Sequence, residues 1–227
     1  MRYEFDFSAL VDFWPALLQG ALTTLQMTVI AVAGGLAIGV LCAIARRGSN
    51  APLRLLAGAY IELVRNTPYL IQIFFLFFGL SSAGLTLPIF AAAVLTLVIN
   101  VGAYTAEIVR AGMDTVPAGE IEAAEALGLS RPQIYWDVIL RPALERVYPA
   151  LTSQFVLMML SSSVTSQISA EELTAVANNI QSFTFRAFET YIVVALLYLA
   201  LATLLKFALF LFGQFLFPRR RRLGTAI

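Results

Sequence analysis

Long stretches without charge constrain this chain more than any other feature. Residues 66–106 and 147–170 contain no Asp, Glu, Lys or Arg, and a helix needs about 20 apolar residues to cross a bilayer. Lipid offers no partner for backbone N–H and C=O groups, so such stretches must be helical. With 59% apolar and 13% charged residues, the chain lacks the polar surface of a water-soluble domain. The sequence predicts an all-α integral membrane protein.

Five apolar runs are expected to span the membrane, and turn-forming residues at 79–88 separate the second run from the third. We interpret residues 1–227 as one transmembrane domain. The expected spans are 17–45, 68–80, 89–110, 147–168 and 191–217.

The orientation follows from the basic flanks, because short cytoplasmic loops carry an excess of Lys and Arg. In a chain with five spans, the three basic sites follow the first, third and fifth spans and so lie on the same side of the membrane. That side is expected to be the cytoplasm, which puts the N-terminus outside and the C-terminus inside. A nucleic-acid role for the terminal arginines is disfavoured, because they directly follow a span. The basic sites are Arg46, Arg47 and Arg54, then Arg110, Arg131, Arg141 and Arg146, then Arg219–Arg222.

Two amphipathic segments are too polar to span. Residues 52–64 are expected along the inner membrane interface, with Thr67-Pro68 turning the chain into the bilayer. Residues 171–189 are expected at the outer surface, between the last two spans.

A polar segment at residues 114–142 separates the third and fourth spans. Asp114 or Thr115 is expected to cap a helix that Gly128 ends in a left-handed conformation. A capping box from Ser130 to Gln133 should open a second helix through Leu140, ended by Arg141-Pro142. The result would be a helical hairpin on the cytoplasmic face.

Polar residues within the third span share one helix face, since Asn100, Tyr104 and Glu107 follow an i, i+4, i+7 spacing. They could line a translocation path, or they could hold helices together by hydrogen bonds. For Glu107, pairing with a nearby Arg is the favoured interpretation.

The outer half of the fourth span is rich in hydroxyl groups, from Ser161 to Ser169. Such a segment could be a broken, wet helix that lines a binding site, with Ser161, Ser162 and Ser163 as candidates. The alternative is that the hydroxyls bond back to their own helix carbonyls.

No catalytic or metal site is predicted. The chain has no His, and its single Cys42 lies in an apolar run. It also has no Gly-rich phosphate-binding loop. We therefore expect no cofactor bound by this chain itself.

The sequence EAAEALG within the polar segment resembles the EAA loop of bacterial ABC importer permeases. In that family the loop forms a coupling helix that docks on the ATPase subunit, and the motif positions here are Glu122, Ala123, Ala124 and Gly128. The proline of the family's Leu-Pro pair is displaced by one residue, to Pro142. The resemblance implies the permease fold of type I importers.

Three further segments, RNTPYLIQIFFLFFGL, AYTAEIVRAG and ELTAVANNIQSFTFRAFETY, are similar to the branch that takes up polar amino acids such as His, Glu, Gln, Arg and opines. Many relatives carry Lys-Asp where this chain has Leu160-Ser161. Either a sister permease supplies that charge, or the substrate is held differently.

The resemblance implies a multi-pass permease of the bacterial inner membrane that is not itself an enzyme. Its implied partners are two copies of an ATPase subunit that binds ATP and Mg, a second permease subunit, identical or homologous, and an extracytoplasmic amino-acid-binding protein. A self-contained ion-coupled transporter is the alternative, but it needs a carboxylate at mid-membrane, and Glu107 lies too near the inner end. A scaffold without transport would leave the polar stripe unexplained.

Overall fold

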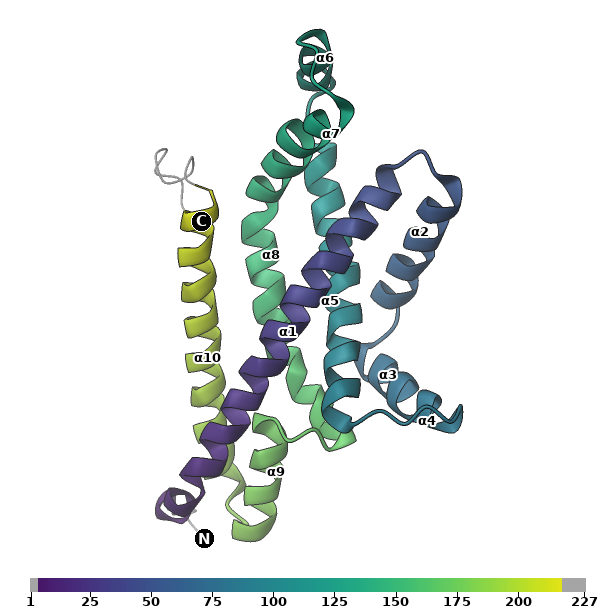
Figure 1. The fold of residues 1–227 in the computed structure, drawn as a ribbon. Helices are drawn as coiled ribbons and strands as arrows, with labels where there is room; N and C mark the ends of the chain where they lie inside the picture. Colours follow the sequence, from purple (N-terminus) through teal and green to yellow (C-terminus); the bar gives the residue numbers. More distant parts are fainter. Residues whose placement is uncertain (1–3, 218–227) are drawn as a thin grey trace. The chain divides into compact units, whose positions relative to one another are not determined.

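The structure is a computed structural model that describes residues 4–217, and these residues form helices and connecting turns without any strand. The basic run Arg219–Arg222, used above for orientation, lies outside the described residues. The helices, shown in Figure 1, are η1 (Ser8–Phe13), α1 (Trp14–Arg47), α2 (Ala51–Arg65), α3 (Tyr69–Phe74), η2 (Phe75–Gly79), α4 (Leu80–Ser82), α5 (Ile89–Asp114), α6 (Ala118–Ala126), α7 (Arg131–Gln133), η3 (Ile134–Leu140), α8 (Arg141–Ser161), η4 (Ser162–Ile168), α9 (Leu173–Thr184) and α10 (Ala187–Leu216).

Four of these helical stretches are long and apolar enough to cross a membrane, and a fifth span arises if α2 is joined with α3–α4. The four are Ser8–Arg47, Ile89–Asp114, Arg131–Ile168 and Ala187–Leu216. The joined pair is interrupted at Pro68, whose ψ of 137° is extended. The expected second span therefore corresponds to a short helix that follows a break, as the Thr67-Pro68 signal indicates.

The chain divides into two compact units, and α1, α5, α8 and α10 contribute residues to both. The first unit contains residues 1–33, 67–98 and 155–206. In this unit α9 lies beside the first turns of α1 and α10 (Figure 1). Its apolar core consists of Leu10, Leu17, Ala21, Met159, Leu173, Ala177, Ile180, Val194 and Leu201.

Of the described residues, the second unit contains 34–66, 99–154 and 207–217. Here α1 and α5 approach closely because small residues face each other. A Cβ added at Gly35 would lie 2.4 Å from Val101, and one at Gly39 would lie 2.5 Å from Thr105. The Tyr60 hydroxyl of α2 donates to the Ile99 carbonyl of α5 at 2.6 Å. These contacts fix the third predicted span between its neighbours.

Two local expectations are wrong. The helix through Leu140 does not end at Arg141-Pro142 but continues into α8, because η3 is a π-helix whose wider turn precedes the proline. The missing N–H of Pro142 then removes a single bond at the start of α8. Neither Asp114 nor Thr115 caps α6, since α5 includes Asp114 and Pro117 occupies the N-cap position.

The segment 171–189 forms α9 as a polar connector, yet two of its carboxyl groups are buried. Glu172 and Glu189 are both 0% exposed. Glu172 occupies the N-cap position of α9, and Glu189 accepts a hydrogen bond from the Asp6 N–H at 3.0 Å. Hydropathy alone could not reveal this burial, because the partners come from distant parts of the chain.

Candidate functional site

The first candidate site is the helical pair between α5 and α8, in the second unit. Helix α6 begins after Pro117 and carries Glu120 in its first turn, where a negative charge favours the helix dipole. It ends as predicted at Gly128, whose φ is +76°. The N–H of Gly128 donates to the Glu125 carbonyl at 2.9 Å, and that of Leu129 to the Ala124 carbonyl at 3.2 Å. This is a Schellman ending, which needs a left-handed residue.

The second helix of the pair begins at the predicted capping box. The Gln133 side-chain oxygen accepts from the Ser130 N–H at 2.9 Å and from the Ser130 hydroxyl at 2.7 Å. Helix α6 packs on η3, where Ile134, Ile139 and Leu140 are buried. The pair is therefore a built element with its own small core.

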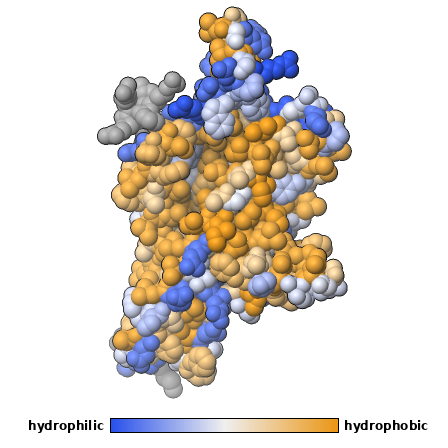
Figure 2. Space-filling view, viewed as in Figure 1, coloured by the Kyte–Doolittle hydropathy of each residue, from blue (hydrophilic) through white to orange (hydrophobic). Residues whose placement is uncertain are grey.

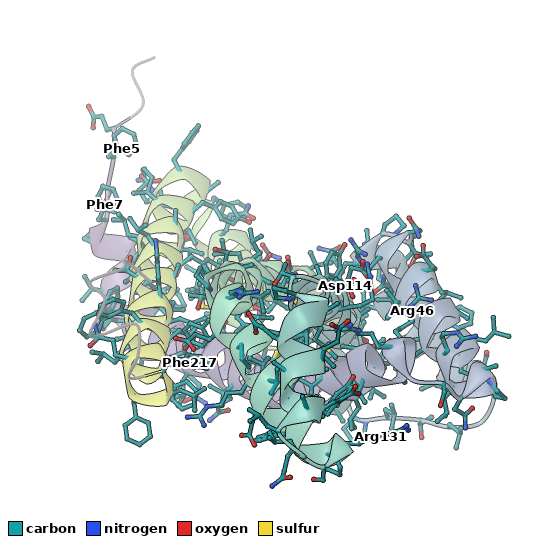
Figure 3. All side chains as sticks on the ribbon, turned by 90° about the horizontal axis from the view of Figure 1, so that it is seen from above. Phe5, Phe7, Arg46, Asp114, Arg131 and Phe217 are labelled. Carbon is teal, nitrogen blue, oxygen red and sulfur yellow. The ribbon has the colours of Figure 1, made fainter. Side chains whose placement is uncertain are left out.

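Exposure separates the four motif residues into two kinds. Glu122, Ala123 and Gly128 are exposed, whereas Ala124 is 5% exposed and faces into the chain. Ala124 therefore supports the packing of α6 and offers no contact surface. Figure 2 shows hydrophilic residues gathered over α6 and α7, and Figure 3 labels Arg131 at the start of α7.

Two large apolar side chains stand out on this polar pair. Leu127 is 79% exposed and Trp136 is 60% exposed. Both were missed in the sequence, although each is a large apolar residue within a polar segment. Exposed groups of this kind mark contact surfaces, because leaving them in water is unfavourable.

The stripe on α5 also lies in the second unit, and its residues are engaged with neighbours. Asn100 is 4% exposed. The Arg65 guanidinium lies 5.5 Å from the centre of the Tyr104 ring, within reach of a cation–π interaction. Glu107 forms an ion pair with Arg110, one turn further along α5. The pairing considered for Glu107 is therefore present in the structure.

Basic and acidic groups form a network at the C-terminal end of α5. Arg110 reaches the Asp114 carboxylate at 2.6 Å, and Arg47 of α1 lies 3.7 Å from the same carboxylate. Arg47 also donates to the Met113 carbonyl at 2.7 Å. Arg146 of α8 donates to the Thr115 hydroxyl at 2.7 Å. These contacts hold the start of the loop against α1 and α8.

The hydroxyl-rich segment lies in the first unit, where the helix changes from α to 3₁₀ geometry at Ser162. Its hydroxyl groups donate to carbonyls three or four residues back. The acceptors are Leu157 for Ser161 at 3.0 Å, Met159 for Ser162 at 2.6 Å, Leu160 for Ser163 at 2.7 Å, Ser162 for Thr165 at 2.7 Å and Ser163 for Ser166 at 2.7 Å. The segment is thus an altered helix that satisfies its own hydroxyl donors.

A buried carboxyl group follows directly after this segment. Glu172 accepts from the Ala175 N–H at 2.9 Å and from the Tyr198 hydroxyl at 2.6 Å. Burial raises the pKa of Glu172 above its ordinary value, and these hydrogen bonds oppose that rise. The group ties α9 to α10, and Thr24 of α1 accepts from the Leu173 N–H at 3.2 Å.

No set of three potential metal-ligating side chains occurs in the part of the chain that the structure describes. The candidate residues of the α5 stripe belong to the second unit, and those of the hydroxyl-rich segment belong to the first.

Comparison with known proteins assigns the chain to a family. The family described as "Binding-protein-dependent transport system inner membrane component" matches residues 35–222. The chain belongs to this family. It is accordingly a permease subunit of an ABC transporter, whose ATPase is a separate subunit and whose substrate arrives on a binding protein.

Curated relatives match over nearly the whole chain. The glutamine transport system permease protein GlnP of Escherichia coli K12 is 39% identical over 208 residues, which cover 91% of this chain and 95% of that protein. The probable glutamine ABC transporter permease protein GlnM of Bacillus subtilis 168 is 38% identical over 194 residues, which cover 86% and 90%.

Solved structures agree with this assignment. A chain from the crystal structure of an amino acid ABC transporter with histidines has a TM-score of 0.85 at 37% identity, and the match covers 93% of this chain and 99% of that chain. A chain of the inward-facing MetNI methionine ABC transporter has a TM-score of 0.74 at 24% identity, covering 91% and 98%. The latter likeness shows the fold alone.

Proposed function

We propose that this chain is the membrane subunit of an importer that carries a polar amino acid, with glutamine as the first candidate, into the cytoplasm. The support is the glutamine transport function in the names of relatives 38–39% identical to it. The chain acts as one permease domain, residues 1–227, in the bacterial inner membrane.

The proposed orientation places the N-terminus outside and the loop 114–142 in the cytoplasm. The basic residues of the second unit support it, because Arg47, Arg110 and Arg146 gather around the start of this loop. Cytoplasmic flanks of spans are enriched in such residues.

The observation that carries the proposal is the exposure of Leu127 and Trp136, the two exposed large apolar side chains of the helical pair. A groove on the ATPase subunit would bury these two side chains, while Glu122, Ala123 and Gly128 line the contact around them. Ala124 serves the packing beneath. This assigns the EAA loop as the coupling element between the permease and the ATPase.

The complete transporter would contain two ATPase subunits that bind ATP and Mg, a second permease subunit, identical or homologous, and an extracytoplasmic binding protein. ATP closes the ATPase dimer and draws the two coupling loops together, which rocks the membrane helices from inward-open to outward-open. Hydrolysis resets them.

Two groups of path residues are proposed, each within its own unit: Asn100, Tyr104 and Glu107 in the second, and Ser161, Ser162 and Ser163 in the first. The three serines are proposed as neutral lining, because their hydroxyl groups donate to carbonyls of their own helix. Because Arg110 pairs with Glu107, the stripe on α5 offers the Tyr104 hydroxyl and the Asn100 amide without an isolated charge on these residues. Neutral polar groups suit a substrate whose side chain is an uncharged amide. Glu107 then acts by orienting Arg110 at the inner end.

Reconstitution tests this function. Vesicles that contain the permease, its ATPase and its binding protein should accumulate labelled glutamine only when ATP and Mg are present on the ATPase side. Uptake driven by an ion gradient without ATP would overturn the proposal and favour a self-contained transporter. Binding-protein variants that do not release glutamine serve as the control for leakage.

A further inference from the structure

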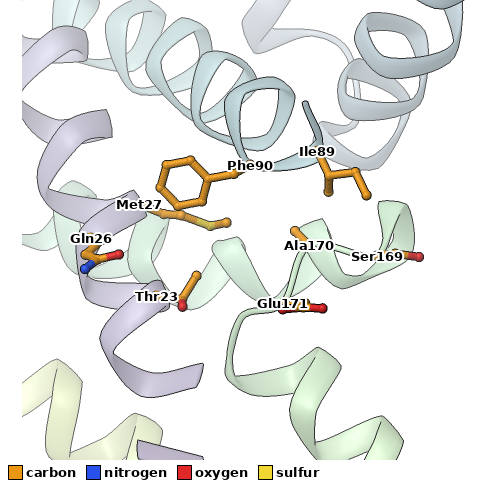
Figure 4. Close-up of a pocket in the computed structure, with 8 residues that line it drawn as sticks. All are labelled: Thr23, Gln26, Met27, Ile89, Phe90, Ser169, Ala170 and Glu171. Atoms are coloured by element: carbon orange, nitrogen blue, oxygen red, sulfur yellow. The ribbon is translucent and has the colours of Figure 1, made fainter. Parts of the chain in front are cut away.

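A cavity in the first unit has no role in the coupling or the path described above. It has a volume of about 310 Å³, and α1 lies on one side of it, opposite the turn at residues 169–171 (Figure 4). Ile89 and Phe90, at the start of α5, close it on a third side (Figure 4). Small-molecule sites begin at about this size, roughly 300 Å³.

A second cavity of about 320 Å³ adjoins the first and shares Thr23 and Glu171 with it. It continues between α1 and α9, past Gln19 and Asn179. Together the two cavities form a groove, called here the α1–α9 groove, with Glu171 in its shared middle section. Phe90 lines the first cavity and Phe183 lines the second.

The charge in the groove is negative. Glu171 is exposed and is the sole charged residue among those that line the two cavities in the described chain. No ion pair or hydrogen bond of its carboxylate occurs within residues 4–217. A carboxylate in this position attracts a cationic group and disfavours an anion.

Neutral hydrogen-bonding side chains line the same cavity on opposite sides (Figure 4). Gln26 of α1 and Ser169 lie on the same cavity. Ser169 differs from the serines before it, because its φ of +63° takes it out of the 3₁₀ helix in which hydroxyls bond to their own carbonyls. Amide N–H and hydroxyl groups can donate to an oxyanion beside the carboxylate-bound cation.

We propose that the α1–α9 groove binds a zwitterion that carries a primary ammonium group next to an oxyanion. Glu171 accepts hydrogen bonds from the ammonium, Gln26 of the facing helix α1 donates to the oxyanion, and Phe90 contacts the apolar remainder. Two sources supply this chemistry at the outer face of a membrane: a free amino acid and the headgroup of phosphatidylethanolamine. The outward placement rests on the proposed orientation.

The test uses the assembled permease–ATPase complex in nanodiscs of phosphatidylcholine, whose headgroup lacks an ammonium N–H. One arm measures binding of labelled L-glutamine by equilibrium dialysis, with N-acetylglutamine as the competitor that lacks the ammonium. The other arm adds phosphatidylethanolamine and counts retained lipid by native mass spectrometry. Each arm compares the wild type with Glu171→Gln, and with Asp12→Asn as a matched exposed carboxylate outside the groove.

We expect one of the two probes to bind about tenfold or more weakly to Glu171→Gln, because a charge-assisted hydrogen bond is lost, and to bind normally to Asp12→Asn. Which arm responds identifies the source. Equal binding to wild type and Glu171→Gln in both arms overturns the inference. If the wild type binds neither probe through Glu171 but still shows ATP-driven glutamine uptake, only this inference fails and the proposed function stands. If the wild type shows Glu171-dependent binding but no ATP-driven uptake, the proposed function fails and this inference stands.

Discussion

The loop at residues 114–142 and the segment at 161–169 are both polar interruptions of an apolar chain, yet they use their polarity in opposite ways. In the loop, Glu122 and Ala123 are exposed, and Leu127 is exposed beside them. In the segment, the hydroxyls of Ser161 and Ser163 donate to carbonyls of their own helix. One region presents groups outward, and the other uses its groups within the helix.

The difference lies in what each region requires to be stable. The segment belongs to a membrane span, where an unpaired donor is costly, so short side chains that can reach a nearby carbonyl satisfy themselves. In the proposed orientation the loop lies in the cytoplasm, so its exposed surface is free to serve a partner. Polarity in a membrane protein therefore indicates a partner site only where the groups are not already bonded.

The largest effect should come from removing the exposed apolar groups of the loop. Replacing Leu127 and Trp136 together by Ala should weaken ATPase binding by well over about thirtyfold, since truncating a single central contact of an interface already costs about 2 kcal/mol or more. Co-purification of the ATPase and ATP-driven uptake both report the loss.

The control is Leu55→Ala on α2, because Leu55 is 73% exposed but lies outside the loop. It should leave ATPase binding unchanged. If the double variant retains normal binding and uptake, the loop does not dock through these side chains, and the contrast between the two regions loses its functional meaning.

A smaller effect is expected at the end of α6. Gly128→Ala places a side chain at a φ of +76°, which costs about 1–2 kcal/mol in the left-handed region. The Schellman ending should loosen, and hydrogen exchange of residues 118–129 should accelerate, with a partial loss of uptake.

The chain provides a matched control within the same helix. Gly119 has no atom within 4 Å of an added Cβ, and Ala there gains up to about 1 kcal/mol of helix propensity. Gly119→Ala should therefore slow exchange or leave it unchanged. Equal acceleration in both variants would mean that the left-handed turn does not fix the shape of the loop.

In the loop, the features that depend only on neighbouring residues could be predicted from the sequence. The left-handed Gly128 and the Ser130–Gln133 capping box follow from neighbouring residues, and the structure has both. The expected stop at Pro142 is wrong because the π-helical turn before it removes the usual clash. The expected cap at Asp114 is wrong because Arg110 and Arg47 bind its carboxylate.

Features that depend on distant contacts could not be predicted in this way. Ala124 is buried in the arrangement in which α6 packs against η3. The Glu172 carboxylate accepts a hydrogen bond from Tyr198, which lies in a different helix. For the hydroxyl-rich segment the sequence left a wet helix and self-bonding both open, and the hydroxyls from Ser161 to Ser166 decide between them. The structure has the self-bonded arrangement, which only backbone geometry could distinguish.

The buried carboxyl beside the segment offers a test that depends on pH. Burial raises the pKa of Glu172 above its ordinary value of 4.5, so the folded state favours the protonated form. The stability from this group is complete below pH 4.5 and is lost as the pH rises through the raised pKa. Glu172→Gln is neutral throughout, so its melting temperature relative to wild type should increase from pH 4 to pH 8.

Glu171→Gln is the control for this measurement, because Glu171 is exposed and adjacent. The change in melting temperature of Glu172→Gln is compared with that of this control over the same range. If Glu172→Gln follows the control, the carboxyl of Glu172 gains enough from its hydrogen-bond donors to offset its burial.

The smallest effect should follow from removing a hydroxyl of the segment. In Ser163→Ala, the lost bond to the Leu160 carbonyl should lower stability by about 1 kcal/mol or less, and the KM for uptake should change less than twofold. A serine that donates to its own helix still has lone pairs that can accept from a substrate N–H. A tenfold rise in KM with unchanged stability would therefore mean that the substrate uses this acceptor, so the segment would present groups outward as the loop does. Ser163→Thr, which retains the hydroxyl, should restore the KM in that case, whereas a purely structural defect would not be corrected in KM alone.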